Sequence, residues 1–248
     1  MSKFEDNVFF VTGAGSGIGR ATAIAAAAAG GKVMLTGTTP SALEETAQLI
    51  GDDKRVALRR LDVANADDVE AAVDETTRRF GRLDFALNNA GIYGPVVPLD
   101  EYPIEEFRRV IEVNVLGTMW CMRSEVKRML LQRSGVIVNI ASAGARKILR
   151  NSTAYIASKR AVVGLTEAAA LEYSNTGIRI NALSPGLTRT AMTNVLTPEQ
   201  LAATEASIPI GRIAEGADIA DAILWLFSDD ARYVIGSDVL VDGGFQMS

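Results

Sequence analysis

The stretch Val8-Phe-Phe-Val-Thr-Gly-Ala-Gly-Ser-Gly-Ile-Gly19 decides the fold of this chain. Its first five residues form an apolar run that stops at glycines, as a buried parallel strand does. An alanine-rich helix is expected to follow from residue 20 to residue 29 and to end at two glycines. Glycines at such a junction let the backbone turn sharply, and the helix then offers free N–H groups and a positive dipole end. The junction therefore predicts a dinucleotide-binding turn, with an ordinary tight turn as the alternative.

The same strand-then-helix alternation continues to the end of the chain. Further strands are expected at 33–36, 55–61, 83–87, 135–140, 178–183 and 239–241. Further helices are expected at 40–50, 66–80, 104–132, 153–174 and 219–227. Repeated βα units imply a parallel sheet with helices on both faces. The prediction is an α/β fold, a Rossmann-like doubly wound parallel sheet of about seven strands, within one domain spanning 1–248. The irregular segment 187–212 is interpreted as a substrate flap, because ligands bind beyond the carboxyl ends of such strands.

Composition excludes several classes of function. The net charge of −5 argues against a nucleic-acid partner, because proteins that bind nucleic acid normally present a basic face. The chain has no histidine, which excludes histidine-based triads and histidine-ligated metals, and no metal site is expected. The N-terminus does not resemble a signal peptide, and no apolar run is long enough to cross a membrane. The single cysteine, Cys121, fits a reducing cytoplasm.

A tyrosine and a lysine four residues apart, Tyr155 and Lys159, suggest proton chemistry. On a helix these side chains share one face. Lowering the pKa of a tyrosine from about 10 to near 7 needs about 4 kcal/mol of preference for phenolate. A neighbouring ammonium in a partly dry pocket supplies energy of that order. The pair alone is weak evidence, because most such pairs are a core ring beside a solvated amine.

A set of motifs gives the pair its context. They are Thr12-Gly-x-x-x-Gly-x-Gly19, Asn88-Asn-Ala-Gly91, Asn114, Ser142, Tyr155-x-x-x-Lys159 and Pro185-Gly186. In their order and spacing they resemble the short-chain dehydrogenase/reductase family, and the resemblance runs from about residue 5 to Val241-Asp-Gly-Gly244.

The resemblance implies roles for individual residues. Hydride would pass between a nicotinamide ring and a carbonyl or alcohol carbon, with the protein managing one proton. Tyr155 would be the general acid or base, Lys159 would lower its pKa and hold the ribose, and Ser142 would bond the substrate oxygen. Asn114 would support a water relay behind Lys159. The other implied cofactor contacts are Gly13, Ser16, Gly17, Ile18, Gly19, Gly37, Thr38, Thr39, Asp62, Val63, Asn89, Ala90, Gly91, Pro185, Gly186, Leu187 and Thr188. Tyr93, Ala143 and Gly186 would join Ser142 and Tyr155 around the substrate.

The choice between NAD(H) and NADP(H) depends on the end of the second strand. An acid there usually binds the ribose 2′-OH of NAD, but this chain has Gly37 at that position. No Lys or Arg occurs from residue 33 to residue 53. The strand end therefore also lacks a basic side chain that could pair with a 2′-phosphate. The hydroxyls of Thr38 and Thr39 and the next helix N-terminus could take a phosphate. We therefore expect NADP(H), with NAD(H) possible.

The sequence leaves the substrate open among ketones, alcohols, sugars and acyl compounds. The basic residues Arg146, Lys147, Arg150 and Arg189 could meet an acidic substrate or could be ordinary surface charges. A 3-oxoacyl-thioester reductase of lipid synthesis and a non-catalytic dinucleotide sensor are the alternatives. A sensor would not need Asn114, Ser142, Tyr155 and Lys159. The resemblance also implies a homotetramer assembled through long helices.

Overall fold

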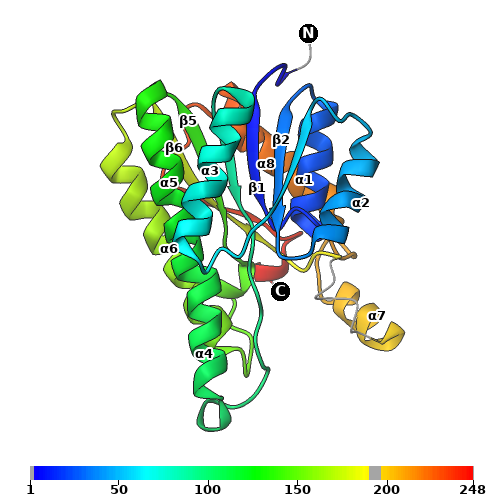
Figure 1. Cartoon of the computed structure of the whole chain (residues 1–248). Coiled ribbons are helices and arrows are strands. Elements are labelled where there is room, and N and C mark those ends of the chain that lie inside the picture. Colours follow the sequence, from blue (N-terminus) through cyan, green and yellow to red (C-terminus); the bar gives the residue numbers. More distant parts are fainter. Residues whose placement is uncertain (1–2, 190–196, 248) are drawn as a thin grey trace.

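The computed structural model describes residues 3–189 and 197–247. In this part of the chain, seven strands form one sheet in the order β3-β2-β1-β4-β5-β6-β7 (Figure 1). The strands are β1 (Val8–Thr12), β2 (Lys32–Gly37), β3 (Val56–Arg60), β4 (Phe85–Asn88), β5 (Gly135–Ile140), β6 (Ile178–Pro185) and β7 (Asp238–Val241). Every neighbouring pair is parallel. The expected doubly wound, Rossmann-like α/β fold is confirmed.

Helices cover both faces of this sheet. They are α1 (Gly17–Ala28), α2 (Pro40–Ile50), α3 (Ala66–Phe80), α4 (Ile104–Ile111), α5 (Gly117–Gln132), α6 (Thr153–Tyr173), α7 (Pro198–Ala206) and α8 (Gly216–Phe227). Among the described residues, no helix combines the length and the apolar character that crossing a membrane requires.

Alternation along the strands builds two cores, because successive side chains point to opposite faces. Phe9 and Val11 of β1 pack in the core beneath α1, α2 and α8. Phe10, between them, packs in the core beneath α3, α5 and α6. All three side chains are fully buried, as the uninterrupted apolar run predicts for a central parallel strand.

The helix expected over 104–132 is interrupted. A π-helical turn, η2 (Glu112–Leu116), joins α4 to α5 and contains Asn114. The Asn114 amide explains the interruption, because it bonds the backbone of a residue outside the helix. Its Oδ1 accepts from Ile92 N, and its Nδ2 donates to Ile92 O, each at 2.8 Å. A π-turn inserts one extra residue, and such turns are frequent at functional sites.

The segment 187–212 contains a helix that the sequence analysis missed, and its residues 190–196 lie outside the described part. Helix α7 begins with a capping box in which Thr197 and Gln200 bond each other's backbone N–H groups, with proline at the first helical position. The string Thr197-Pro-Glu-Gln200 carries this signal in the sequence.

The fourth strand begins two residues later than expected. The side-chain amide of Gln132 forms hydrogen bonds with both backbone groups of Leu83: it accepts from the N–H and donates to the carbonyl, at 2.8 Å each. Leu83 is therefore unavailable to the sheet ladder.

A buried polar cluster joins α5 and α6 to the middle of the sheet. Asn88 Nδ2 donates to Glu125 Oε2 at 3.0 Å and to Asn139 Oδ1 at 2.9 Å, and Asn139 Nδ2 donates to Thr166 Oγ1 at 2.9 Å. Glu125 Oε1 and Asn88 Oδ1 are buried without a partner among the described residues. Burial raises the pKa of Glu125 to about 8.

Candidate active site

A cavity of about 650 Å³ opens at the carboxyl ends of β1, β4, β5 and β6. It includes the point where strand order reverses between β1 and β4, the usual ligand position in open α/β sheets. Most of the predicted site residues line it: Gly13, Ser16, Gly17, Ile18, Asn89, Ala90, Gly91, Tyr93, Ser142, Ala143, Tyr155, Lys159, Pro185, Gly186, Leu187 and Thr188. Asn114, Gly19, Gly37, Thr38, Thr39, Asp62 and Val63 are not among the lining residues.

The glycine turn after β1 has the form that a pyrophosphate requires. Gly13 and Gly17 have positive φ angles of 64° and 52°, which favour glycine. A Cβ on Gly19 would clash with the carbonyl oxygen of Gly13, so this glycine keeps the turn tight. The side chain of Ser16, at the N-cap of α1, makes no capping hydrogen bond to the backbone N–H groups of the first helical turn. The turn therefore fits a dinucleotide phosphate group.

Thr12 ties this turn to the segment after β4. Its Oγ1 accepts from Asn89 N at 2.9 Å and from Ala90 N at 3.0 Å, while Asn89 Nδ2 donates to Thr12 O at 3.0 Å. Asn89, Ala90 and Gly91 are thus held beside the glycine turn.

Asn114 lies immediately behind the cavity wall. Its Nδ2 also donates to Ser158 Oγ at 2.9 Å, and the side chain is fully buried. A Cβ on Gly91 would come within 3.1 Å of Asn114 Oδ1 and 3.4 Å of Lys159 Nζ. Asn114 therefore shapes the turn at Gly91 beside Lys159, and its predicted part in a water relay stays a prediction.

Lys159 projects from α6 into the buried end of the cavity. Its ammonium donates to Ile140 O at 2.8 Å, and burial lowers its pKa to about 8. Among the described residues it has no ion pair with a carboxylate. A buried cation without a counter-ion is held at an energetic cost, which is typical of functional sites.

The phenol of Tyr155 corrects one expectation. Burial raises its pKa; a hydrogen bond with Ser142 acts in the opposite direction, and Tyr93 adds to the increase. Lys159 is not among the groups that shift this pKa; its Nζ donates to Ile140 O and lies 5.8 Å from the centre of the Tyr155 ring. Tyr93 stacks on this ring with centroids 4.3 Å apart, and its hydroxyl lies 2.9 Å from Ser152 Oγ.

Ser142 follows β5 and has a local partner as well as the contact with Tyr155. Its Oγ accepts from Gly144 N at 3.0 Å, across the first turn of η3 (Ala143–Ala145). The bond fixes the hydroxyl without using its proton, which is left to donate.

Four other predicted cofactor contacts, Asp62, Val63, Thr38 and Thr39, are not among the residues that line the cavity. Asp62 Oδ1 accepts from Ala64 N at 3.0 Å, and Oδ2 accepts from Arg109 at 3.1 Å. Burial opposes ionisation, but these bonds hold the pKa of Asp62 below its usual value. Val63 packs its buried side chain against Gly117. Thr38 and Thr39 are exposed, and Thr39 makes no side-chain bond at the N-cap of α2.

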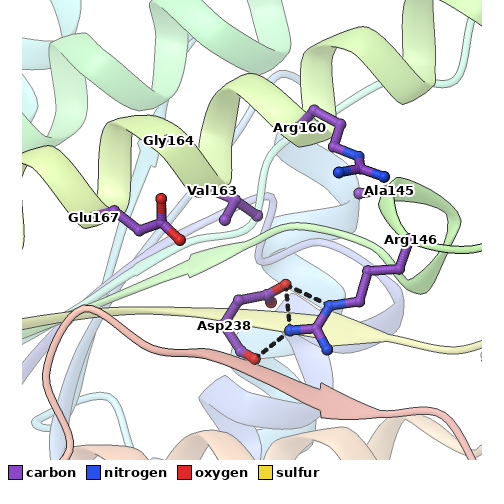
Figure 2. Close-up of a pocket in the computed structure, with 7 residues that line it drawn as sticks. All are labelled: Ala145, Arg146, Arg160, Val163, Gly164, Glu167 and Asp238. Carbon is purple, nitrogen blue, oxygen red and sulfur yellow. Dashed lines mark hydrogen bonds and ion pairs between the residues drawn. The ribbon is translucent and has the colours of Figure 1, made fainter.

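Three of the four basic residues near the site, Arg146, Lys147 and Arg189, bind other groups of the protein. Arg146 lines a smaller hollow of about 350 Å³. It binds the carboxylate and the backbone carbonyl of Asp238 there (Figure 2). Arg189 pairs with Glu205 and Glu215, and Lys147 donates to Phe245 O. These contacts favour the interpretation as structural charges over an acidic-substrate site.

Sequence reasoning missed part of the cavity wall. Val96, Ile140, Ala141 and Phe245 also line it. Phe245 follows the last strand directly after two glycines, and no periodicity marks it as a site residue.

Comparisons with known proteins agree with this geometry. A family model described as enoyl-(acyl carrier protein) reductase matches residues 13–246. The chain is 37% identical to cyclohexanol dehydrogenase of Acinetobacter sp. (strain SE19), across 98% of this chain and 96% of that protein. It is 39% identical to cis-4-hydroxycyclohexanecarboxylate dehydrogenase of Sinomonas cyclohexanicum, across 98% and 97%. The crystal structure of levodione reductase superposes with a TM-score of 0.93 and 38% identity, covering 99% of both chains.

The expected family and reaction class are thereby confirmed. The chain belongs to the short-chain dehydrogenase/reductase family and is an NAD(P)-dependent oxidoreductase that acts on alcohol and carbonyl groups.

Proposed function

We propose that this enzyme interconverts an alicyclic secondary alcohol and its ketone. The observation that carries the proposal is the gathering of Ser142, Tyr155 and Lys159 in one cavity whose remaining wall is largely apolar. Two relatives are named for cyclohexanol and for a hydroxycyclohexane carboxylate, and both cover nearly the whole chain. Such a cavity favours a substrate with one polar oxygen on an apolar ring.

The proposed chemistry divides between cofactor and protein. The nicotinamide, when bound, supplies or accepts the hydride. Ser142 donates a hydrogen bond to the substrate oxygen, and Tyr155 Oη delivers a proton to that oxygen in reduction or removes one in oxidation. Lys159 offers its remaining N–H groups to the ribose of the nicotinamide half. Asn114 fixes the backbone at Ile92 and, through Ser158, the helix that carries both Tyr155 and Lys159.

We propose NADP(H) as the preferred cofactor, on the basis of a residue that sequence reasoning missed. The parallel register pairs Gly37 of β2 with Arg60 of β3. Arg60 is exposed and has no ion pair among the described residues. An arginine near the end of β2 suits a 2′-phosphate, and the acid that would repel it is absent. Replacing Arg60 with alanine should weaken NADPH binding about 10-fold or more, measured by cofactor fluorescence, and leave NADH binding unchanged. Equal losses for both cofactors would contradict this preference.

The remaining proposals concern the setting of the enzyme. We take residues 1–248 as one dinucleotide-binding and catalytic domain, with 187–212 as the substrate flap. A homotetramer is supported by exposed apolar side chains on α5 and α6, such as Leu131 and Leu171. Light scattering tests it, and a monomer would contradict it. A cytoplasmic location is supported by the single, buried Cys121.

The test of function is a 340 nm assay with NADPH and NADH against cyclohexanone, acyclic ketones and a 3-oxoacyl thioester. The expected result is turnover of cyclohexanone that Tyr155→Phe abolishes. Turnover of the thioester alone would favour lipid synthesis instead. Cofactor binding without any turnover would favour the sensor.

A further inference from the structure

The segment that follows β7 forms a turn beside the cavity. After β7, the Asp242 carboxylate accepts from Gly244 N at 2.9 Å and from Gln246 N at 2.8 Å, which folds the segment into η5 (Phe245–Met247). Gly243 and Gly244 have φ angles of 61° and 88°, which few other residues adopt. The turn also packs on the end of the flap, where Ile210 N donates to Gly243 O at 3.1 Å. It is therefore an ordered part of the fold.

Two consecutive basic residues connect the loop after β5 to β7 and to this turn. Arg146 binds Asp238 at the start of β7, as Figure 2 shows. Lys147 Nζ donates to Phe245 O at 3.0 Å and lies 4.4 Å from the centre of the Phe245 ring. The second contact combines a charge-assisted hydrogen bond with a cation–π interaction, so it restrains both the backbone and the ring.

The fastened ring faces the same space as the candidate catalytic groups. Phe245 lines the cavity with Val96, Leu149 and Leu187, side chains from three other segments. Leu149 belongs to the loop that begins at Ser142, and a Cβ on Gly144 would touch it at 3.5 Å. Lys147 and Leu149 thus connect Phe245 to the loop that presents the Ser142 hydroxyl.

We propose that Phe245 determines substrate specificity and that Lys147 is its positioning residue. The ring provides a fixed apolar wall against the part of the substrate that lies away from the reacting oxygen. The proposal rests on the proposed function, since it assigns the wall that would contact the alicyclic ring. A wall fixed at two points limits substrate size more sharply than a mobile side chain, because it cannot rearrange around a larger group.

The experiment compares kcat and KM for cyclohexanone, 4-tert-butylcyclohexanone and a series of straight-chain ketones of increasing length. The variants are Phe245→Ala, Lys147→Met, Lys147→Arg and the double variant Phe245→Ala/Lys147→Met. Gln246→Ala is the matched control, because its side chain is exposed on the same turn and its backbone N–H, which the substitution keeps, donates to Asp242. Circular dichroism and cofactor affinity by fluorescence verify that each variant folds and binds cofactor.

The expected result for Phe245→Ala is a fall of about 10-fold in kcat/KM for cyclohexanone, mainly through KM, with the larger ketone gaining relative to it. Lys147→Met should change the ratio of kcat/KM for the larger ketone to that for cyclohexanone in the same direction, by roughly 3-fold. Lys147→Arg should keep this ratio near the wild-type value. In the double variant the lysine change should have no further effect, because its action passes through the ring.

Failure of this inference differs from failure of the proposed function. If the wild type accepts only straight-chain ketones, the proposal of an alicyclic substrate is refuted. The role of Phe245 is then tested by comparing how kcat/KM depends on chain length in the wild type and in Phe245→Ala. Equal effects of Phe245→Ala on all substrates, or none, overturn the role of Phe245. Additive effects in the double variant overturn the role of Lys147. Inactivity toward every ketone refutes both proposals.

Discussion

Replacing Glu125 with glutamine should make the protein more resistant to alkaline pH. Glu125 is fully buried in α5, its Oε1 has no partner among the described residues, and no cation there pairs with it. Cys121, one turn away, is a buried thiol whose own pKa is raised by burial and by Glu125. Burial raises the pKa of Glu125 to about 8, so the folded protein retains a proton that the unfolded chain loses near pH 4.5.

The magnitude follows from proton linkage. Between pH 4.5 and 8 the folded state binds the extra proton, so this carboxyl lowers the free energy of unfolding as pH rises. The slope is about 1.4 kcal/mol per pH unit, which amounts to roughly 4 kcal/mol from pH 5 to pH 8. Above pH 8 both states are ionised and the slope disappears. Glutamine has nearly the same shape, still accepts from Asn88 Nδ2, and adds an N–H that can satisfy Asn88 Oδ1.

The assay is urea unfolding of both proteins at half-unit steps from pH 5 to pH 9, at one fixed protein concentration. Near pH 5 the two should have similar stability, and the advantage of Glu125→Gln should grow steadily and level off above pH 8. Glu70→Gln is the control, because Glu70 is a surface carboxylate whose pKa is lowered by a hydrogen bond from Lys127. Parallel curves for wild type and Glu125→Gln would refute a neutral buried carboxyl.

Three further predictions concern the site and the core. Tyr155→Phe should lower kcat by roughly 10²- to 10⁴-fold while the cofactor Kd stays within a few-fold, and retained turnover would remove Tyr155 from proton transfer. Gly19→Ala should weaken cofactor binding at least about 10-fold in fluorescence titration, because its Cβ would clash with Gly13 O and open the turn; unchanged binding would contradict the tight-turn argument. Lys159→Met should abolish turnover, and its free energy of unfolding should rise relative to that of wild type as pH falls from 10 to 8. Burial lowers the pKa of Lys159 to about 8, so between pH 8 and the ordinary lysine pKa the wild type becomes more stable as pH rises. Urea unfolding at several pH values measures this effect. A constant difference in free energy of unfolding between the two proteins would contradict it.

The sequence was sufficient for the strands and for most of the cavity wall, because both depend on local patterns. The apolar run at 8–12 and the glycines after it have one main structural interpretation, and Tyr155 and Lys159 share a helix. What it missed depends on contacts between distant segments. The π-turn is formed because Asn114 bonds Ile92, twenty-two residues away, and no periodicity in 104–132 shows it. Likewise Arg60 comes beside Gly37 through strand register, and Phe245 joins the wall through Lys147, ninety-eight residues away. The expected direction of the pKa shift of Tyr155 differs from that in the structure, where burial raises it, because the spacing of Tyr155 and Lys159 does not reveal how deeply the phenol is buried.

The π-turn at Glu112–Leu116 has a consequence for how this helix tolerates changes in length. Its extra residue sets the rotation of α4 relative to α5, and one residue corresponds to about 100° of helix rotation. Deleting a single residue here would restore a regular α-helix but would swing either Asn114 away from Ile92 or the apolar face of α5 away from the sheet. Side chains around the turn can therefore vary, whereas the number of residues cannot. Gaps should be absent from this helix when active relatives are aligned, even where sequence identity across it is low.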